Sequence, residues 1–183
     1  QTMVPTLVTE VVENVAKIFR DILCEDGRSV RVVFDQGVDP QSLKVTGDEG
    51  RLGQVITNLV DNAVSFSPAD GVVVITVRQT PQTVDIVIDD EGPGIPEDRL
   101  AIIFDRFYTD RPQSEALRGK NSGLGLSISR EIVHAHGGEI WAESRRPAGA
   151  AADAKPQGAR FVVRLPRTIQ TSRGGSGATH RRY

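Results

Sequence analysis

The sequence is poor in cysteine, in net charge and in long apolar runs. Its single cysteine, Cys24, excludes an internal disulfide and a cysteine-rich zinc site, and it fits a reduced, cytosolic setting. The 22 basic and 24 acidic residues leave a net charge of −2, which is too small to mark a nucleic-acid or membrane-surface partner. The longest apolar run, residues 72–75, is far shorter than the roughly 20 residues that span a bilayer.

No signal peptide is predicted, because the residues that follow Gln1 do not form a charged segment followed by an apolar one. A start at glutamine rather than methionine predicts an excised piece of a longer protein. The 183 residues are 38% hydrophobic and 25% charged, which fits one globular domain of ordinary composition. We expect that domain to span residues 1–166 and the polar stretch 167–183 to be a disordered tail.

Hydrophobic spacing predicts a mixture of helices and strands without regular alternation. A period near 3.6 predicts helices at 6–24, 49–66 and 124–135 and a short one near 97–103, and Asp48 is a suitable N-cap for the second. A period of two predicts strands at 29–35, 43–46, 72–78, 83–90, 139–143 and 160–165. This order favours an α+β fold, a two-layer sandwich with one mixed sheet and helices on one face.

Two longer stretches show no apolar period. Residues 109–122 are rich in charge and predict a mobile loop. Residues 145–158 are rich in alanine, glycine and proline and predict the floppy tip of a hairpin between the last two strands.

The helix predicted at 49–66 carries two asparagines, Asn58 and Asn62, beside its apolar stripe. Positions four apart lie on one helical face, so the two amides are neighbours. An amide oxygen is a neutral, hard ligand that suits Mg²⁺. A solvated helix face is the alternative interpretation, and the spacing alone does not decide between them.

Asp90 ends the strand predicted at 83–90 and shares a face with the apolar residues two and four positions before it. Its carboxylate is therefore expected at the floor of an apolar region, where it has to be hydrogen-bonded. An amino group of a ligand, such as N6 of adenine, is one suitable donor. Gly92 and Gly94 would let the backbone approach a flat ring closely. The alternative is an ordinary turn with a solvated aspartate.

Residues 121–126 place Gly123 and Gly125 at the start of a predicted helix. Free N–H groups and the helix dipole favour an anion such as a phosphate there. The stretch lacks the Lys-[Ser/Thr] ending of a P-loop, and it does not follow a strand in a βαβ unit, so a Rossmann interpretation fails. A flexible loop that leads into an ordinary helix is the alternative.

The order and spacing of these segments resemble the N, G1, F and G2 boxes of the histidine-kinase ATPase family. The boxes correspond to the asparagine helix, the Asp-x-Gly-x-Gly turn, the phenylalanine-rich residues 104–108 and the Gly-x-Gly helix start. That family includes the sensor kinases, gyrase, the heat-shock chaperone of the same fold and MutL. The resemblance covers residues 6–166 and implies a Bergerat-type ATP-binding fold that uses ATP and Mg²⁺.

Residue 58 favours the sensor histidine kinases within that family. The ATP-hydrolysing members typically carry glutamate there as a general base for water, whereas Asn58 cannot take a proton. A histidine acceptor needs less help because neutral imidazole already offers a lone pair. Residues 65–68 and 107–112 look most like the ChvG-type envelope- and acid-sensing kinases.

The resemblance implies a role for each matching residue. Asn58 and Asn62 would be catalytic, Asn62 would coordinate Mg²⁺, Asp90 would fix N6 of adenine, and the loop 109–122 would close as a lid. The residues expected to contact the nucleotide are Asn58, Asn62, Ser65, Phe66, Asp90, Gly92, Gly94, Ile95, Phe107, Arg111, Lys120, Ser122, Gly123, Leu124, Gly125 and Leu126.

Positions 65 and 66 depart from the Lys-Tyr pair that is usual in sensor kinases. Phe66 can still stack on adenine, but Ser65 offers no charge to the phosphates. We expect Arg111, Arg118 and Lys120 to replace that cation in part. Simple solvation of the loop is an alternative for each of them.

None of the three histidines lies in the His-Glu/Asp-x-x-[Ser/Thr/Asn]-Pro setting of a phosphoacceptor. His134 and His136 precede a Gly-Gly pair at a helix end, where a structural role is expected. The acceptor is therefore expected on dimerisation helices that precede Gln1 in the full-length kinase, with a response regulator downstream and no nucleic-acid partner. We expect the piece itself to be monomeric and to be the cytoplasmic part of a bacterial inner-membrane sensor.

Two other functions stay open at this stage. One is an ATPase or serine kinase of the same superfamily, which a glutamate at position 58 would have supported. The other is a degenerate module that binds nucleotide or only protein partners, which the serine at position 65 makes conceivable.

Overall fold

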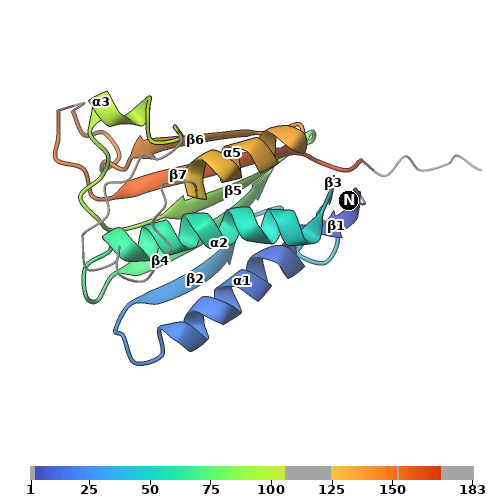
Figure 1. The fold of residues 1–183 in the computed structure, drawn as a ribbon, viewed down its shortest axis with the longest axis horizontal. Helices are drawn as coiled ribbons and strands as arrows, with labels where there is room; N and C mark the ends of the chain where they lie inside the picture. Colours follow the sequence, from blue (N-terminus) through green and yellow to red (C-terminus); the bar gives the residue numbers. More distant parts are fainter. Residues whose placement is uncertain (1–2, 106–124, 152, 170–183) are drawn as a thin grey trace, which may run out of the picture.

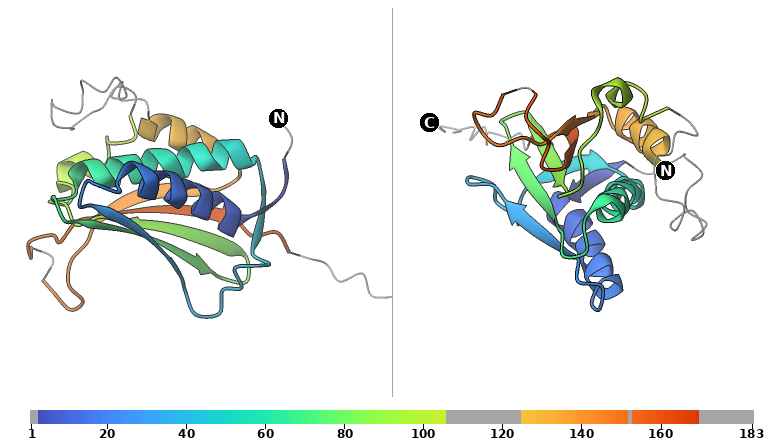
Figure 2. Two further views of the ribbon diagram at one scale, coloured as in Figure 1. Left: turned by 90° about the horizontal axis from the view of Figure 1, so that it is seen from below. Right: turned by 90° about the vertical axis from the view of Figure 1, so that its left-hand side faces the viewer.

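The computed structural model describes residues 3–105, 125–151 and 153–169. The three longer of the four described helices cover one face of a five-stranded sheet, and a small two-stranded sheet lies at one end (Figures 1 and 2). The helices are α1 Val8–Ile22, α2 Glu49–Phe66, the short α3 Glu97–Leu100 and α5 Gly125–Ala135. The strands are β1 Val4–Leu7, β2 Ser29–Phe34, β3 Lys44–Gly47, β4 Val72–Gln79, β5 Thr83–Asp89, β6 Glu139–Ser144 and β7 Ala159–Pro166.

The large sheet has the order β2-β4-β5-β7-β6 and is mixed. Strands β2 and β4 run parallel, and the other three neighbouring pairs are antiparallel. The predicted α+β sandwich, with one mixed sheet and helices on one face, is confirmed.

The core fills the layer between this sheet and the helices (Figure 2, left). Strand β5 sends Val84, Ile86 and Ile88 toward the helices by its period of two. Helix α2 packs against them with a stripe of buried residues, because positions three and four apart share one helical face. The stripe consists of Leu52, Val55, Ile56, Leu59 and Ala63.

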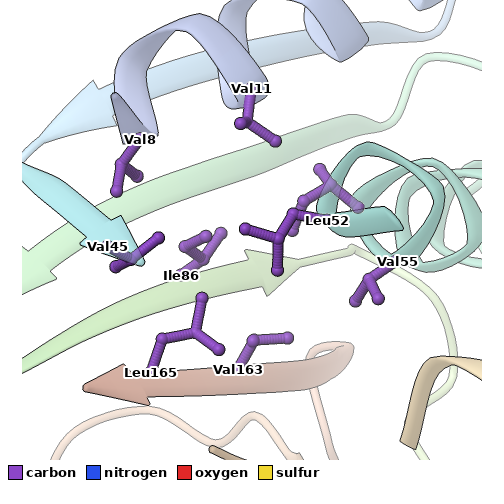
Figure 3. Close-up of a pocket in the computed structure, with 9 residues that line it drawn as sticks. Val8, Val11, Val45, Leu52, Val55, Ile86, Val163 and Leu165 are labelled. Atoms are coloured by element: carbon purple, nitrogen blue, oxygen red, sulfur yellow. The ribbon is translucent and has the colours of Figure 1, made fainter. Parts of the chain in front are cut away.

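Figure 3 shows a gap in this core between α1, α2, β3, β5 and β7. Its lining is entirely aliphatic, from Val8 on α1 to Leu165 on β7. Its volume of about 10 Å³ is at the lower limit for one water molecule, and the aliphatic lining offers a water no hydrogen-bond partner. The gap is therefore a dry packing defect and plays no part in the site described below.

The face of the large sheet that points away from the helices is covered by ion pairs. Arg164 of β7 forms a two-pronged pair with Asp85 of β5 at 2.8 and 2.9 Å, and Arg160 pairs with Asp89 at 2.7 and 2.9 Å. The strands bring these partners opposite each other by register. The residues buried between the two pairs are Val87 and Val162.

Strand β1 was not predicted from the sequence. Residues 4–7 continue the apolar pattern of α1, so a single helix from residue 6 was predicted. In the structure α1 begins at Val8, and β1 pairs antiparallel with β3, with Val4 opposite Gly47 and Leu7 opposite Lys44. The partner lies about 40 residues away in the chain, beyond the reach of a local pattern.

The ordered chain extends past the boundary predicted at residue 166. The Thr168 N–H donates to the Lys44 carbonyl at 2.9 Å, and Arg167 pairs with Val45. Residues 167–169 therefore belong to the domain rather than to a tail. Residues 170–183 lie outside the described part of the chain.

His136 connects the end of α5 to the start of α2. Its Nδ1 donates to the Ile132 carbonyl at 2.7 Å, and its Nε2 accepts from the Asp48 N–H at 3.0 Å. These partners fix the neutral tautomer with the proton on Nδ1. Asp48 also caps α2, since its carboxylate accepts from the Arg51 N–H. The predicted structural role of this histidine is confirmed.

Replacement of His136 by phenylalanine is expected to lower the free energy of unfolding by about 1–3 kcal/mol, because two partly or fully buried polar groups lose their partner. Urea unfolding followed by circular dichroism measures the loss. His134→Phe is the matched control, since His134 is exposed in the last turn of α5, two residues before His136, and a change within about 0.5 kcal/mol is expected there. Equal losses in both variants would contradict the assigned role.

Candidate functional site

Helix α2 carries three of the predicted site residues along one side. Asn58, Asn62 and Phe66 follow one another at intervals of four, so they form one row. With a rise of about 1.5 Å per residue, the row is about 12 Å long. Its two ends contact different parts of the chain, the start of α5 and the turn after β5.

Asn58 ties α2 to the start of α5. Its amide nitrogen donates to the Gly125 carbonyl at 3.2 Å and to the Ser129 hydroxyl at 3.2 Å. Both amide protons are thereby used, and the side-chain oxygen forms no hydrogen bond with a described residue. A carboxylate could not replace this amide, because it has no proton to donate to the Gly125 carbonyl. The structure therefore brings the N box and the first residue of the G2 helix together.

Asn62 differs from Asn58 because its amide forms no hydrogen bond with any described residue. The side chain is 8% exposed, in the middle of the row. Among the described side chains only Arg145 has a polar atom that is both fully buried and unpartnered, so the Asn62 amide keeps contact with solvent. An amide that forms no hydrogen bond within the protein and is mostly buried is able to bind a ligand or a metal ion.

Asp90 is 1% exposed, and the predicted burial of its carboxylate is confirmed. Its Oδ1 accepts two hydrogen bonds, from the Gly92 N–H and the Ala159 N–H, both at 2.9 Å. Burial raises the pKa of Asp90 above its ordinary value of 3.8, although both N–H donors and the Arg145 charge oppose the rise. Its Oδ2 accepts nothing from the described residues, so half of this carboxylate is open to a donor from outside.

The turn after Asp90 packs against α2 and against the connection between β6 and β7. A Cβ on Gly92 would lie 2.6 Å from the Phe66 carbonyl oxygen, and a Cβ on Gly94 would lie 2.6 Å from the Pro156 Cβ. Gly94 also has a φ of +83°, which favours glycine. Both glycines were predicted to allow the close approach of a ligand ring. The described contacts explain them by the close approach of the protein's own atoms.

A single hydroxyl fixes Ile95 at the end of this turn. The Ile95 N–H donates to Ser144 Oγ at 2.9 Å, and that hydroxyl donates to the Ile95 carbonyl at 2.9 Å. Ser144 is the last residue of β6. No local pattern predicts this contact, since 49 residues separate the partners.

The connection 145–158 was expected to be a floppy hairpin tip, and this prediction is wrong for its base. The Arg145 N–H donates to the Gly158 carbonyl, and the Gln157 N–H donates to the Arg145 carbonyl, each at 2.7 Å. Gly158 has a φ of +139°, and any Cβ there would overlap the Asp90 carbonyl oxygen. The base of the connection thus forms the back wall of the turn that carries Asp90.

Gly158→Ala is expected to lower the free energy of unfolding by more than about 2 kcal/mol, because it adds both backbone strain and a clash with Asp90. Gly149→Ala is the matched control in the same connection. Gly149 also has a positive φ, +77°, but a Cβ there meets nothing within 4 Å, so only the conformational cost of about 1 kcal/mol is expected. Urea unfolding of the two variants measures the difference, and equal losses would contradict the back-wall role.

The remaining predicted residues fall into two groups. Ser65 is half-buried and donates to the Asp61 carbonyl within its own helix at 2.9 Å, while Gly125 and Leu126 form the first turn of α5. Phe104 is buried and meets Phe161 edge-on at 6.2 Å, so it packs in the core. Outside the described residues lie Phe107, Arg111, Arg118, Lys120, Ser122, Gly123 and Leu124, together with the expected lid.

Residues 47–169 match the family described as histidine kinase-, DNA gyrase B-, and HSP90-like ATPase. Sensor protein ChvG of Rhizobium meliloti is 46% identical over 136 residues, which cover 73% of this chain and 23% of that protein. A solved structure of the mycobacterial sensor histidine kinase MprB is 29% identical with a TM-score of 0.74, over 92% of this chain and 99% of that one.

A further solved structure is that of the histidine kinase ThkA in complex with the response regulator TrrA. It is 27% identical to this chain, with a TM-score of 0.71, over 91% of this chain and 42% of that one. The chain therefore spans about a quarter of the length of ChvG and less than half of ThkA. Within the described residues no helix is both long enough and apolar enough to cross a membrane.

Proposed function

The chain belongs to the histidine kinase-, DNA gyrase B-, and HSP90-like ATPase family, and we propose that it is the ATP-binding catalytic domain of a two-component sensor histidine kinase. The resemblance found in the sequence motifs, including that to the ChvG type, is confirmed by the similarity to ChvG and MprB. The proposed reaction transfers the γ-phosphoryl group of ATP to a histidine on another part of the full-length protein.

The observation that carries this proposal is the state of the Asp90 carboxylate. One of its oxygens is held by two main-chain N–H groups, and the other accepts nothing from the described residues. An open, buried acceptor is matched by a donor such as the 6-amino group of adenine. Burial makes an unmatched acceptor costly, so the site favours a base with an amino group over one without.

The residues present fit a Mg²⁺ ion held by an amide. Asn62 has an uncommitted side chain in the row between Asn58 and Phe66, and an amide oxygen is a hard ligand of the kind that Mg²⁺ binds. Asn62 would hold the ion. When bound, Mg²⁺ supplies charge neutralisation for the phosphate oxygens.

The chain's own residues provide the positioning on which phosphoryl transfer depends. Asn58 holds the start of α5 against α2 through its two amide protons. The N-terminal end of α5 is the positive end of that helix, so it favours the phosphates of the nucleotide. Asn58 has no proton-accepting group to activate water, which favours transfer to histidine over hydrolysis.

The acceptor histidine is not provided by the described histidines. His136 is committed to Asp48 and Ile132, and His134 lies on the exposed side of α5 near its end. We infer that the acceptor belongs to dimerisation helices elsewhere in the full-length kinase and that a response regulator receives the phosphoryl group. In this proposal the domain is the cytoplasmic part of an inner-membrane sensor.

The test combines this chain with a separate fragment that carries the acceptor helices, in the presence of ATP and Mg²⁺. The expected product is an acid-labile phosphohistidine on the acceptor fragment, and none is expected on this chain alone. Steady hydrolysis of ATP by the chain alone would contradict the proposal in favour of an ATPase. An absent nucleotide response, or one independent of Mg²⁺, would contradict it in favour of a degenerate module.

A further inference from the structure

Arg145 stands at the point where β6 ends, directly behind the turn that carries Asp90. Its Nη1 donates to the Asp90 main-chain carbonyl at 2.5 Å. The Arg145 main-chain N–H donates to the Gly158 carbonyl, and its main-chain carbonyl accepts from the Gln157 N–H. The Arg145 side chain is 31% exposed, and its contact with the Asp90 carbonyl places the guanidinium against the turn.

The charged side chains beside Asp90 and its turn are Asp89, Glu143, Arg145 and Arg160. Arg160 of β7 engages Asp89 through two hydrogen bonds, and its Nη1 lies 3.9 Å from Glu143. Arg145 reaches Asp89 only at 3.7 Å, through an Nε that is buried and has no hydrogen-bond partner among the described residues. Asp89 is therefore held mainly by Arg160, and Arg145 lies beside both aspartates, so its charge acts on Asp90 as well as on Asp89.

The other described groups that hydrogen-bond to Asp90 are uncharged. Gly92 and Ala159 contribute main-chain N–H groups, and on the α2 side the turn meets the Phe66 carbonyl. Glu91 faces away to accept from the Val72 N–H at 2.7 Å. Burial is the main cause that raises the pKa of Asp90; among the charges, Arg145 lowers this pKa and Asp89 raises it.

We propose that Arg145 is a positioning residue for nucleotide binding, which anchors the Asp90 main chain and supplies the counter-charge that keeps the Asp90 carboxylate ionised in its buried site. The inference rests on the proposed function, because it concerns the carboxylate that receives the purine amino group. An ionised carboxylate offers Oδ2 as an acceptor, whereas a protonated one presents a hydroxyl that competes with the ligand's own donor. Arg145 thus sets the lowest pH at which nucleotide binds well.

The experiment measures the dissociation constant of ATP, at saturating Mg²⁺, from about pH 5 to pH 8 by isothermal titration calorimetry. The proteins are the wild-type chain, Arg145→Gln, Arg145→Lys and the control Arg146→Gln. Glutamine keeps a side-chain donor but no charge, and lysine keeps the charge. Arg146 is matched in charge and position, but its guanidinium donates to the Ala154 carbonyl on the far side of the connection.

At low pH the affinity for ATP is expected to fall. In Arg145→Gln the pH at which this fall occurs, the acid limb of the curve, is expected to rise by about one unit, the size of effect that one nearby opposite charge produces. At the alkaline end the affinity should stay within about threefold, half a pK unit, of wild type. Arg145→Lys should keep the limb in place, and Arg146→Gln should coincide with wild type. The titration of ATP itself is common to all four curves, so their differences report on the protein.

A loss in Arg145→Gln that is the same at every pH would overturn the inference and leave Arg145 a purely structural role. A curve that coincides with wild type would overturn it as well. If wild type binds ATP and Asp90→Asn does not, either result contradicts only the inference about Arg145 and leaves the proposed function standing. If wild-type chain fails to bind ATP, the proposed function itself is wrong.

Discussion

Asp90→Asn is expected to weaken ATP binding by at least about a hundredfold, because it reverses a hydrogen bond to a charged group in a buried site. The two main-chain donors, Gly92 and Ala159, both contact Oδ1, and an asparagine oxygen in that place still accepts from them. The atom that changes is the one in the Oδ2 position, which becomes a donor and faces the donor of the ligand. The variant thus removes recognition while it retains the contacts that hold the turn.

The folded state is expected to tolerate this change. Burial raises the pKa of Asp90 above its ordinary value of 3.8, so the folded chain binds that proton more tightly than the unfolded chain does. The carboxyl's contribution to stability is therefore lost as the pH rises from 3.8 through the raised pKa, and at neutral pH the charged form carries a cost. Asparagine carries no such cost, so the free energy of unfolding at pH 7 should not fall.

Titration with ATP and urea unfolding measure the two quantities in one set of proteins. Asp85→Asn is the matched control, since Asp85 lies on the same strand but pairs with Arg164 on the opposite face of the sheet. It should bind ATP as wild type does. Unchanged ATP affinity in Asp90→Asn would remove the assignment of the purine site.

Asn62→Ala is expected to reduce phosphoryl transfer to a separate acceptor fragment by about a hundredfold or more, the loss typical when one electrostatic contact to the reacting phosphate is removed. Its affinity for ATP without Mg²⁺ should stay close to wild type. The side chain forms no hydrogen bond with the described residues, so its removal leaves no protein group unpaired. The fold is therefore expected to lose little.

The comparison that isolates the metal is an ATP titration of Asn62→Ala and wild type, each with and without Mg²⁺. The gain in affinity from Mg²⁺ should be large in wild type and small in the variant. Asn14→Ala, on the exposed side of α1, controls for the loss of one helical asparagine. If the variant keeps the full Mg²⁺ gain, Asn62 does not hold the ion.

The sequence predicted those parts of the fold whose pattern is local. The period of two in β4 and β5, the apolar stripe of α2 and the Asp48 cap each follow from a short window of residues, and the structure confirms them. The burial of Asp90 also followed from the period of its strand. Strand β1 was missed because it shares an apolar run with α1 and pairs with β3 far along the chain.

The supports of the site could not be predicted for the same physical reason. Ser144 fixes Ile95 across 49 residues, Arg145 reaches Asp90 across 55, and Asn58 reaches Gly125 across 67. Each contact depends on strand order and helix placement, which no local period contains. The one usable signal was Gly158, a glycine at the entry to a strand, which the structure explains by its approach to Asp90.

The central claim is that an open oxygen of Asp90 accepts the amino group of a purine. A double-mutant cycle tests it most directly, with wild-type chain and Asp90→Asn each titrated with ATP and with the analogue that lacks the 6-amino group. The account predicts that the analogue binds wild type much more weakly than ATP does and that Asp90→Asn scarcely distinguishes the two, so the losses are far from additive. If removal of the 6-amino group weakens binding to Asp90→Asn as much as it weakens binding to wild type, the losses are additive and the claim is contradicted.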